Sequence, residues 1–178
     1  MLGSASKALA ADQVAIVQSL SGTGALRVGG EFIKHFWSNR TIYLPTPTWP
    51  NHNGVFNACD LTVKQYRYYN PKTISLDIEG LLEDLGSASE GDVVLLHACA
   101  HNPTGVDPTK EDWKRIANVV QEKGLLVFFD AAYLGFASGN YDDDAFAIRY
   151  FVEEGITILL AVSFAKNMVR SYSIELTL

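Results

Sequence analysis

The chain has 178 residues, 48% of them hydrophobic and 19% charged, a balance typical of one globular domain. Its net charge of −6 argues against nucleic acid as a partner, and no apolar run approaches the length of a membrane span. Two cysteines, Cys59 and Cys99, are too few for a disulfide framework, and no metal-ligand spacing is present. The N-terminus lacks the pattern of a signal peptide, so we expect a soluble protein from a reducing compartment.

The predicted elements alternate between strands and helices along the whole chain. Apolar residues at helical spacing indicate helices, and continuous apolar runs bounded by turn residues indicate buried strands. In chain order, we predict a strand in VAIVQSL, a helix at 24–36, strands at 41–45 and 61–69, a helix at 78–85, a strand at 93–99, a helix at 110–124, a strand at 125–133, a helix at 142–155 and a strand at 156–164.

The helix at 110–124 has the clearest boundaries, because Thr109 precedes it, acidic residues fill its first turn and Gly124 follows it. Buried strands that alternate with amphipathic helices are typical of an α/β fold, with a mostly parallel sheet and helices on both faces. Such sheets bind ligands outside the carboxyl ends of their strands. Four of the predicted strands are followed by unusual polar residues.

The first of these strand ends is the turn Ser21-Gly22-Thr23-Gly24, which leads into a helix. Its glycines allow close backbone approach, and its hydroxyls and free helix N–H groups suit a phosphate. It has neither the lysine of a P-loop nor the glycine spacing of a dinucleotide-binding turn. A serine that merely caps a helix is the alternative interpretation.

The second and third strand ends carry an amide and a carboxylate. Asn102 lies in the turn HNPTG and can present its amide to the strand ends, although it also suits an Asx-turn. Asp130 follows five apolar residues, where a carboxylate is costly unless it meets a positive group or a donor. Tyr133 is near enough to reach the same place. His97 and His101 are interpreted as packed or loop histidines rather than metal ligands.

The fourth strand end is Lys166, after Ser163-Phe164-Ala165. Apolar surroundings favour the neutral amine, which can attack a carbonyl and form a Schiff base. A lysine that reaches into water is the alternative. Together, the four ends predict a ligand with a phosphate, an oxygen that needs a donor, a cationic ring nitrogen and an aldehyde. Pyridoxal phosphate (PLP) has all four groups.

Five segments resemble the aspartate aminotransferases, which are fold-type I PLP enzymes: SLSGTGALR, PTPTWPNH, HACAHNPTG, FFDAAYLGFASG and SFAKN. The resemblance covers residues 12–167, with the motifs in the family's order. It implies transamination between L-aspartate and 2-oxoglutarate, which gives oxaloacetate and L-glutamate, by Schiff-base exchange at Lys166. It also implies a homodimer in which both subunits build each active site.

The resemblance assigns cofactor binding to Ser21, Gly22, Thr23, Trp49, Asn102, Asp130, Tyr133, Ser163 and Lys166. The three residues of the first turn hold the phosphate with Ser163. Trp49 stacks on the ring and borders the substrate, whereas Asn102 donates to the ring hydroxyl and contacts the substrate carboxylate. Asp130 pairs with the ring nitrogen, and Tyr133 bonds to the ring oxygen.

The catalytic residues implied by the resemblance are Lys166, Asp130, Tyr133 and Trp49. Lys166 holds the cofactor and then moves the α-proton of the substrate. His52 supports Asp130 from behind, and no metal is implied.

The chain departs from the family pattern near its C-terminus. The family has a phosphate-clamping arginine eight positions after the lysine, where this chain has Ile174, and Arg170 stands at a different spacing. From about Met168 the resemblance ends. We therefore expect a partial PLP-binding large domain over 1–167 and a divergent tail over 168–178, without the family's N-terminal segment and small domain.

Two alternatives to aspartate transamination stay open. One is a non-catalytic truncated product that keeps part of the fold and binds PLP or a full-length subunit. The other is a related PLP reaction, such as decarboxylation or transamination of an aromatic amino acid, because residues that read the substrate side chain lie mostly outside this chain. The sequence does not separate the cytoplasm from the mitochondrial matrix.

Overall fold

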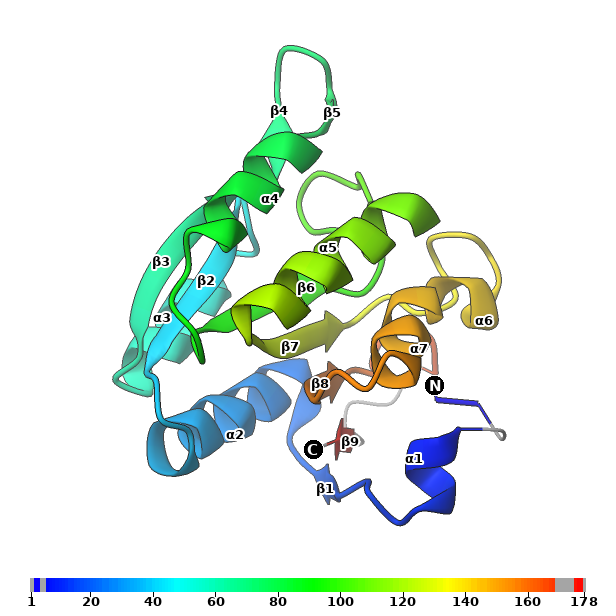
Figure 1. Cartoon of the computed structure of the whole chain (residues 1–178). Coiled ribbons are helices and arrows are strands. Elements are labelled where there is room, and N and C mark those ends of the chain that lie inside the picture. The colour runs from blue at the N-terminus through cyan, green and yellow to red at the C-terminus, as the bar shows by residue number, and fades with distance from the viewer. Residues whose placement is uncertain (1, 4–5, 169–174, 178) are drawn as a thin grey trace.

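A computed structural model describes residues 2–3, 6–168 and 175–177, and the fold is that of these residues. Seven strands form one sheet in the order β1-β9-β8-β7-β6-β2-β3 (Figure 1). The last five in this order run parallel, so the predicted α/β fold with a mostly parallel sheet is confirmed. The strands are β1 Ile16–Gln18, β2 Thr41–Thr46, β3 Thr62–Arg67, β6 Val93–His97, β7 Leu126–Ala131, β8 Ile158–Val162 and β9 Glu175–Thr177.

Helices cover both faces of the sheet (Figure 1). On one face lie α2 Ser21–Phe36 and α3 Asn51–Ala58; on the other lie α4 Ile78–Gly86, α5 Lys110–Lys123 and α7 Phe146–Glu153. The strands supply both cores because successive side chains point to opposite faces. In β7, Phe128 packs towards α2, whereas Val127 and Phe129 pack towards α5 and α7.

Helix α2 lies unusually close to the sheet, which explains the glycines inside it. A Cβ added to Gly29 would lie 2.3 Å from Phe128 Cζ, and one added to Gly30 would lie 2.6 Å from Cys59 Sγ. These glycines weaken the helix signal in the sequence, yet they permit the packing that holds α2 in place. The helix also begins three residues earlier than predicted, at Ser21.

The boundaries of α5 follow the sequence signals. Thr109 Oγ1 accepts a hydrogen bond from the Asp112 N–H at 3.1 Å, and Asp112 Oδ2 accepts one from the Thr109 N–H at 3.0 Å. This reciprocal pair satisfies two N–H groups at the start of the helix. Gly124 ends the helix with φ of 60°, a left-handed conformation that glycine adopts without strain.

Several elements differ from the prediction. The predicted helix at 142–155 is two helices, α6 Tyr141–Asp144 and α7, and the predicted strand at 61–69 is β3 followed by β4 Tyr69–Asn70, which pairs with β5 Ser75–Leu76. Helices α1 Lys7–Ala10 and α3 are additional. Helix α3 is rich in Asn and Gly, which are poor helix formers. It forms where His52 and Phe56, four residues apart, are both fully buried.

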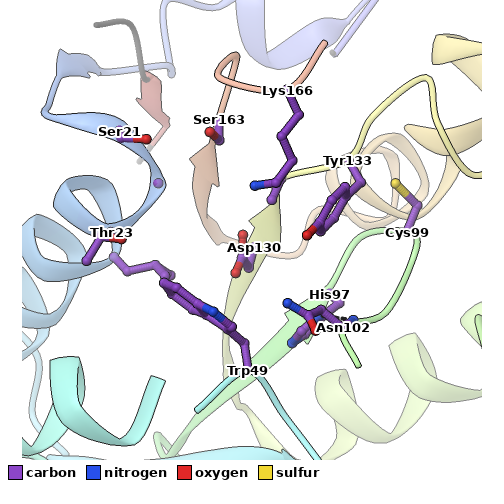
Figure 2. Close-up of a pocket in the computed structure, with 13 residues that line it drawn as sticks. Ser21, Thr23, Trp49, His97, Cys99, Asn102, Asp130, Tyr133, Ser163 and Lys166 are labelled. Atoms are coloured by element: carbon purple, nitrogen blue, oxygen red, sulfur yellow. Dashed lines mark hydrogen bonds between the residues drawn. The ribbon is translucent and has the colours of Figure 1, made fainter. Parts of the chain in front are cut away.

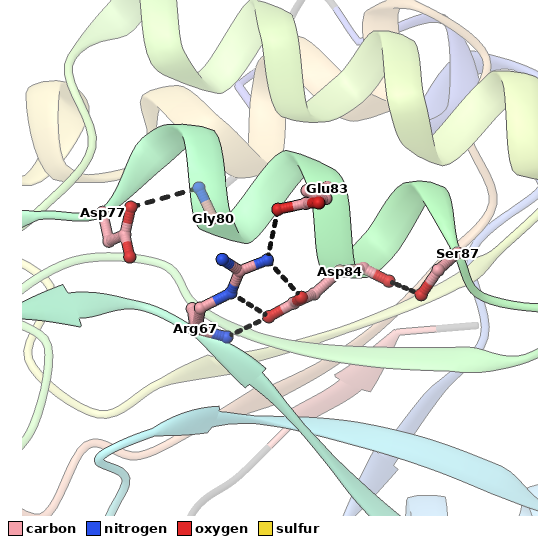
Figure 3. A network of polar contacts seen from close by, with 6 residues as sticks. All are labelled: Arg67, Asp77, Gly80, Glu83, Asp84 and Ser87. Atoms are coloured by element: carbon pink, nitrogen blue, oxygen red, sulfur yellow. Dashed lines mark hydrogen bonds and ion pairs between the residues drawn. The ribbon is translucent and has the colours of Figure 1, made fainter.

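The edge strand β3 is fastened to α4 by a fork of ion pairs (Figure 3). The Arg67 guanidinium donates to both carboxylate oxygens of Asp84 at 2.7 and 3.0 Å and to Glu83 at 2.6 Å. The Arg67 backbone N–H also donates to Asp84, at 2.7 Å. The end of the sheet far from β1 is thereby held by charged, exposed contacts.

At the opposite end of the sheet, β9 pairs antiparallel with both β1 and β8. Residues 175–177 of the predicted divergent tail therefore belong to the same sheet as the rest of the chain. Arg170 and Ile174 lie outside the described residues, and the division into 1–167 and 168–178 stays a prediction.

The connections place a crevice at the carboxyl ends of the central strands. Strands β2 and β6 are neighbours, but the chain leaves β2 towards α3 on one face and leaves β6 towards α5 on the other. Parallel sheets bind ligands at such a point of divergence. No helix in the described part of the chain is long and apolar enough to cross a membrane.

Candidate active site

A cavity of about 270 Å³ lies at this crevice (Figure 2). All nine residues to which the resemblance assigns cofactor binding line it, and Leu26, His97, Cys99 and Ala132 complete the lining. The structure thus brings the four predicted strand ends together, from the segments after β1, β6, β7 and β8 and from the loop after β2. The individual roles of these residues stay predictions.

One wall of the cavity is the first turn of α2. Ser21 enters the helix with φ of 56°, and no side chain caps the helix with a hydrogen bond. The turn lies beside the end of β8, because a Cβ added to Gly22 would be 3.5 Å from Ser163 Cβ. The hydroxyls of Ser21, Thr23 and Ser163 therefore line the cavity together with an uncapped helix N-terminus. That combination of donors suits an anion.

The opposite wall holds Asp130 at the end of β7. Its Oδ2 accepts a hydrogen bond from His52 Nε2 at 2.9 Å, and its side chain is 12% exposed. His52 is fully buried, in the first turn of α3, and lies outside the cavity lining. The carboxylate therefore has His52 as its partner behind and remains open to the cavity in front, while the supporting role of His52 stays a prediction.

Behind Asp130 a chain of hydrogen bonds connects the loops after β2 and β6 with the end of β6 and the first turn of α3. The Asn102 backbone N–H donates to His97 Nδ1 at 3.3 Å, so the ring proton of neutral His97 must lie on Nε2. The Nε2–H of His97 donates to Thr48 Oγ1 at 3.3 Å. The Thr48 hydroxyl then donates its own proton to His52 Nδ1 at 2.8 Å. His52 then carries its proton on Nε2 and donates it to Asp130. Each donor in this series of hydrogen bonds thus has one acceptor.

Burial favours the neutral His97 ring, which the order of donors and acceptors from Asn102 to Asp130 requires. It lowers the pKa of His97 to about 4, against 6.5 for an ordinary histidine, although the charge of Asp130 acts in the opposite sense. His97 and Asp130 also pair in register on adjacent strands.

Aromatic side chains frame the rest of the cavity. Trp49 packs edge-on against His52, with ring centroids 5.3 Å apart. Tyr133 lies under Lys166, whose Nζ is 4.5 Å from the ring centroid. Burial raises the pKa of the Cys99 thiol to about 12, so this pocket residue is a neutral thiol at physiological pH. Among the described lining residues, Lys166 is the only cation.

Two residues of the site were missed from the sequence. Thr48 stands four residues before His52, and His97 ends an apolar strand as Asp130 does, so both had a detectable signal. Their connection depends on which loops meet, which the sequence alone does not show. Within the described residues, no group of three or more His, Cys, Asp or Glu side chains is arranged to hold a metal ion.

Comparison with known proteins agrees with this geometry. The family model "Aminotransferase class I and II" matches residues 2–170. Aspartate aminotransferase 1 of Medicago sativa is 60% identical over 168 residues, which are 94% of this chain and 40% of that relative. The chain thus spans about two fifths of this relative's length. Other relatives are named as cytoplasmic, mitochondrial or chloroplastic aspartate aminotransferases.

Solved structures give the same result. Aspartate aminotransferase from Trypanosoma cruzi is 46% identical, with a TM-score of 0.90 over 93% of this chain and 43% of that one. An aromatic-amino-acid aminotransferase from Burkholderia pseudomallei, solved with covalently bound pyridoxal phosphate, is 34% identical, with a TM-score of 0.94 over 99% of this chain and 44% of that one. This chain belongs to the class I and II aminotransferases, a PLP-dependent family, and its sequence places it with the aspartate aminotransferases.

Proposed function

We propose that this chain provides the cofactor-binding part of an aspartate aminotransferase site, for transamination between L-aspartate and 2-oxoglutarate. One observation carries the proposal: Lys166, Asp130 and the uncapped, hydroxyl-lined N-terminus of α2 line the same cavity. An amine, a carboxylate and an anion site in one cavity are the partners that PLP requires.

The donor set fits PLP group by group. The α2 turn and Ser163 suit its phosphate, Asp130 suits its protonated ring nitrogen, and Asn102 and Tyr133 suit its ring oxygen. When bound, PLP supplies an aldehyde for an amine and a ring that accepts electrons from the substrate's α-carbon.

The chain's own residues divide the remaining work. Asp130 presents its carboxylate to the ring nitrogen, and the hydrogen bond from His52 Nε2 holds that carboxylate in place from behind. Lys166 takes the α-proton at Nζ and returns it, because its flexible side chain extends into the cavity beside Tyr133. Trp49 covers one side and keeps water from the reacting atoms.

The family resemblance extends the proposal to the assembled protein. We expect a homodimer, because a dicarboxylate substrate needs cationic partners and Lys166 is the only cation that lines the cavity within the described residues. The partner subunit and further residues of the full-length protein would supply them. The cytoplasm and the mitochondrial matrix are the proposed compartments.

A coupled assay with aspartate and 2-oxoglutarate tests the activity, and PLP titration tests the binding. We expect the absorption band of a Schiff base between PLP and the chain, and Lys166→Ala should abolish that band. Asp130→Ala should weaken PLP binding by roughly 10- to 150-fold, the range for a hydrogen bond to a charged group. Asp143→Ala, which alters an exposed carboxylate outside the cavity, is the control. PLP binding that survives both Lys166→Ala and Asp130→Ala unchanged would contradict the proposal.

A second candidate is a chain that binds PLP, or a full-length subunit, without turnover. The shortage of cations around the cavity favours it, since aspartate has two carboxylates and Lys166 is the only cation among the described lining residues. A PLP band without transamination in the coupled assay would select this candidate, and turnover by the purified chain would eliminate it.

A further inference from the structure

The side chain of Asn167 connects the two loops that carry Lys166 and Tyr133. Its Nδ2 donates a hydrogen bond to the Leu134 backbone carbonyl at 3.2 Å. Asn167 directly follows Lys166, and Leu134 directly follows Tyr133. The bond therefore joins the residue after the lysine to the residue after the tyrosine whose ring lies against the lysine amine. Figure 2 shows the side chains of Lys166 and Tyr133 next to each other.

The loop that receives this bond is firmly held. Asp144 is buried, and its carboxylate accepts the backbone N–H groups of Gly135, Ala137 and Ser138 at 2.8, 3.1 and 3.0 Å. A carboxylate with three backbone donors fixes the course of the chain between them. Leu134 itself is fully buried. Its carbonyl is thus a fixed point for the neighbouring loop.

The lysine loop, residues 163–168 after β8, contains no buried carboxylate that binds its backbone as Asp144 binds the loop after β7. Within it, the Met168 N–H donates to the Phe164 carbonyl at 3.1 Å, and the Ala165 N–H donates to Ser163 Oγ at 3.4 Å. These two bonds shape the turn after β8, and the Ser163 N–H donates to the Ala131 carbonyl at the end of β7 at 3.2 Å, but none of the three reaches the loop after β7. Lys166 is exposed. The Asn167 amide provides the connection across the gap.

The same amide has a feature that stability does not explain. Asn167 Oδ1 is buried and has no hydrogen-bond partner among the described residues. A buried acceptor without a donor lowers the stability of the fold, whereas a leucine of similar size would avoid that cost. The hydrogen bond from the donor half of the amide to Leu134 is therefore the contact that needs an explanation.

We propose that Asn167 is a positioning residue, which holds the Lys166 side chain over the Tyr133 ring by tethering the lysine loop to the Leu134 carbonyl. Its consequence for PLP capture rests on the proposed function, but its effect on the geometry does not. A lysine held in place meets an incoming aldehyde more often than one that samples solvent.

The geometry is tested in the PLP-free chain by NMR with ¹³C-labelled lysine. The Tyr133 ring should shift the Lys166 ε-CH₂ signal upfield, and Lys166→Arg identifies that signal by its loss. In Asn167→Leu the upfield shift should fall by more than half. Asn70→Ala, which removes an asparagine side chain from the distant β4–β5 hairpin, should leave it intact. An unchanged shift in Asn167→Leu, or no upfield shift in the unsubstituted chain, overturns the proposal.

PLP capture is tested by borohydride reduction at a subsaturating PLP concentration, followed by peptide mass spectrometry. Modification of Lys166 should fall about tenfold in Asn167→Leu, the upper range for one net hydrogen bond. The melting temperature should stay within a few degrees, because the unpaired acceptor is removed as well. Equal modification of Lys166 in both chains overturns the proposal. If Lys166 is not modified even in the unsubstituted chain, the proposed function fails, and the NMR experiment decides the positioning role alone.

Discussion

The two sides of the cavity are built in different ways. The closed side consists of Asp130 and the residues behind it, His52, Thr48 and His97, whose polar atoms bond to one another. The open side consists of Ser21, Gly22, Thr23, Ser163 and Lys166, where hydroxyls, helix N–H groups and an amine line the cavity. The polar atoms of the closed side have partners within the protein, whereas the open side presents donors that suit an anion.

This difference predicts which substitutions affect stability and which affect binding. On the closed side, a lost hydrogen bond leaves a buried partner unsatisfied, so the folded state itself is weakened. On the open side, water can replace a lost hydroxyl until a ligand arrives, so only binding is weakened. Four experiments can break or sharpen this contrast.

The largest expected effect is a loss of stability at acidic pH, which the buried histidines His97 and His101 cause. Burial lowers the pKa of His97 to about 4 and that of His101 to about 3, against 6.5 for an ordinary histidine. Below about pH 6.5 the unfolded chain takes up protons that the folded chain does not, so acidification favours unfolding. His97 alone should cost about 3 kcal/mol of the free energy of unfolding as the pH falls from about 6.5 to about 4.

Urea unfolding at stepped pH values measures this dependence. His97→Gln should flatten the fall in stability between about pH 6.5 and 4, because that side chain does not titrate. The His101 contribution remains in that variant and extends towards about pH 3. A stability profile with the same slope in both chains would contradict a neutral, buried His97.

The next effect is that of Thr48→Val, which interrupts the hydrogen-bond chain of the closed side. The substitution keeps the shape but leaves His97 Nε2–H and His52 Nδ1 without their partner. We expect the free energy of unfolding to fall by roughly 1–3 kcal/mol, the cost of buried unsatisfied groups. Urea unfolding at neutral pH gives the value, and a variant as stable as the parent would show that the chain of bonds is dispensable.

Thr23→Val is the matched substitution on the open side. Because Thr23 is exposed, stability should change by no more than about 0.5 kcal/mol. PLP affinity should fall about tenfold, the lower end of the range for a hydrogen bond to a charged group, since one bond to the phosphate is lost. Equilibrium dialysis with PLP and with pyridoxal, which lacks the phosphate, separates this loss from a general one. An equal loss of affinity for both ligands would place the phosphate elsewhere.

The smallest effect is expected outside both sides, at the ion pairs of Arg67. This side chain is 51% exposed, so its pairs with Glu83 and Asp84 are screened by water despite their short distances. Arg67→Ala should lower the melting temperature by at most a few degrees and leave PLP binding unchanged. Calorimetry measures the melting temperature. A loss larger than that of Thr48→Val would reverse the ranking of buried and exposed contacts.

The sequence predicts best where the signal is local. The ends of α5 follow from Thr109, Asp112 and Gly124, and the buried strands β6, β7 and β8 follow from continuous apolar runs. The gathering of Asp130 and Lys166 at one cavity follows from the rule for parallel sheets, because both stand at strand ends.

The missed features depend on contacts between distant segments. Helix α3 has a poor helix sequence and forms where His52 and Phe56 are buried against the sheet, which no local propensity shows. The bond between Thr48 and His97 joins a loop to a strand end 49 residues away, and the separation of α6 from α7 accompanies the capture of loop N–H groups by Asp144. In each case tertiary contacts decide the structure.

A crystal structure of this chain grown with PLP tests the central claim most directly. The account predicts a phosphate against the first turn of α2 and Ser163, Asp130 beside the ring nitrogen, and a covalent bond to Lys166 Nζ. PLP bound outside the cavity, attached to another lysine, or turned so that its phosphate faces Asp130 would contradict it.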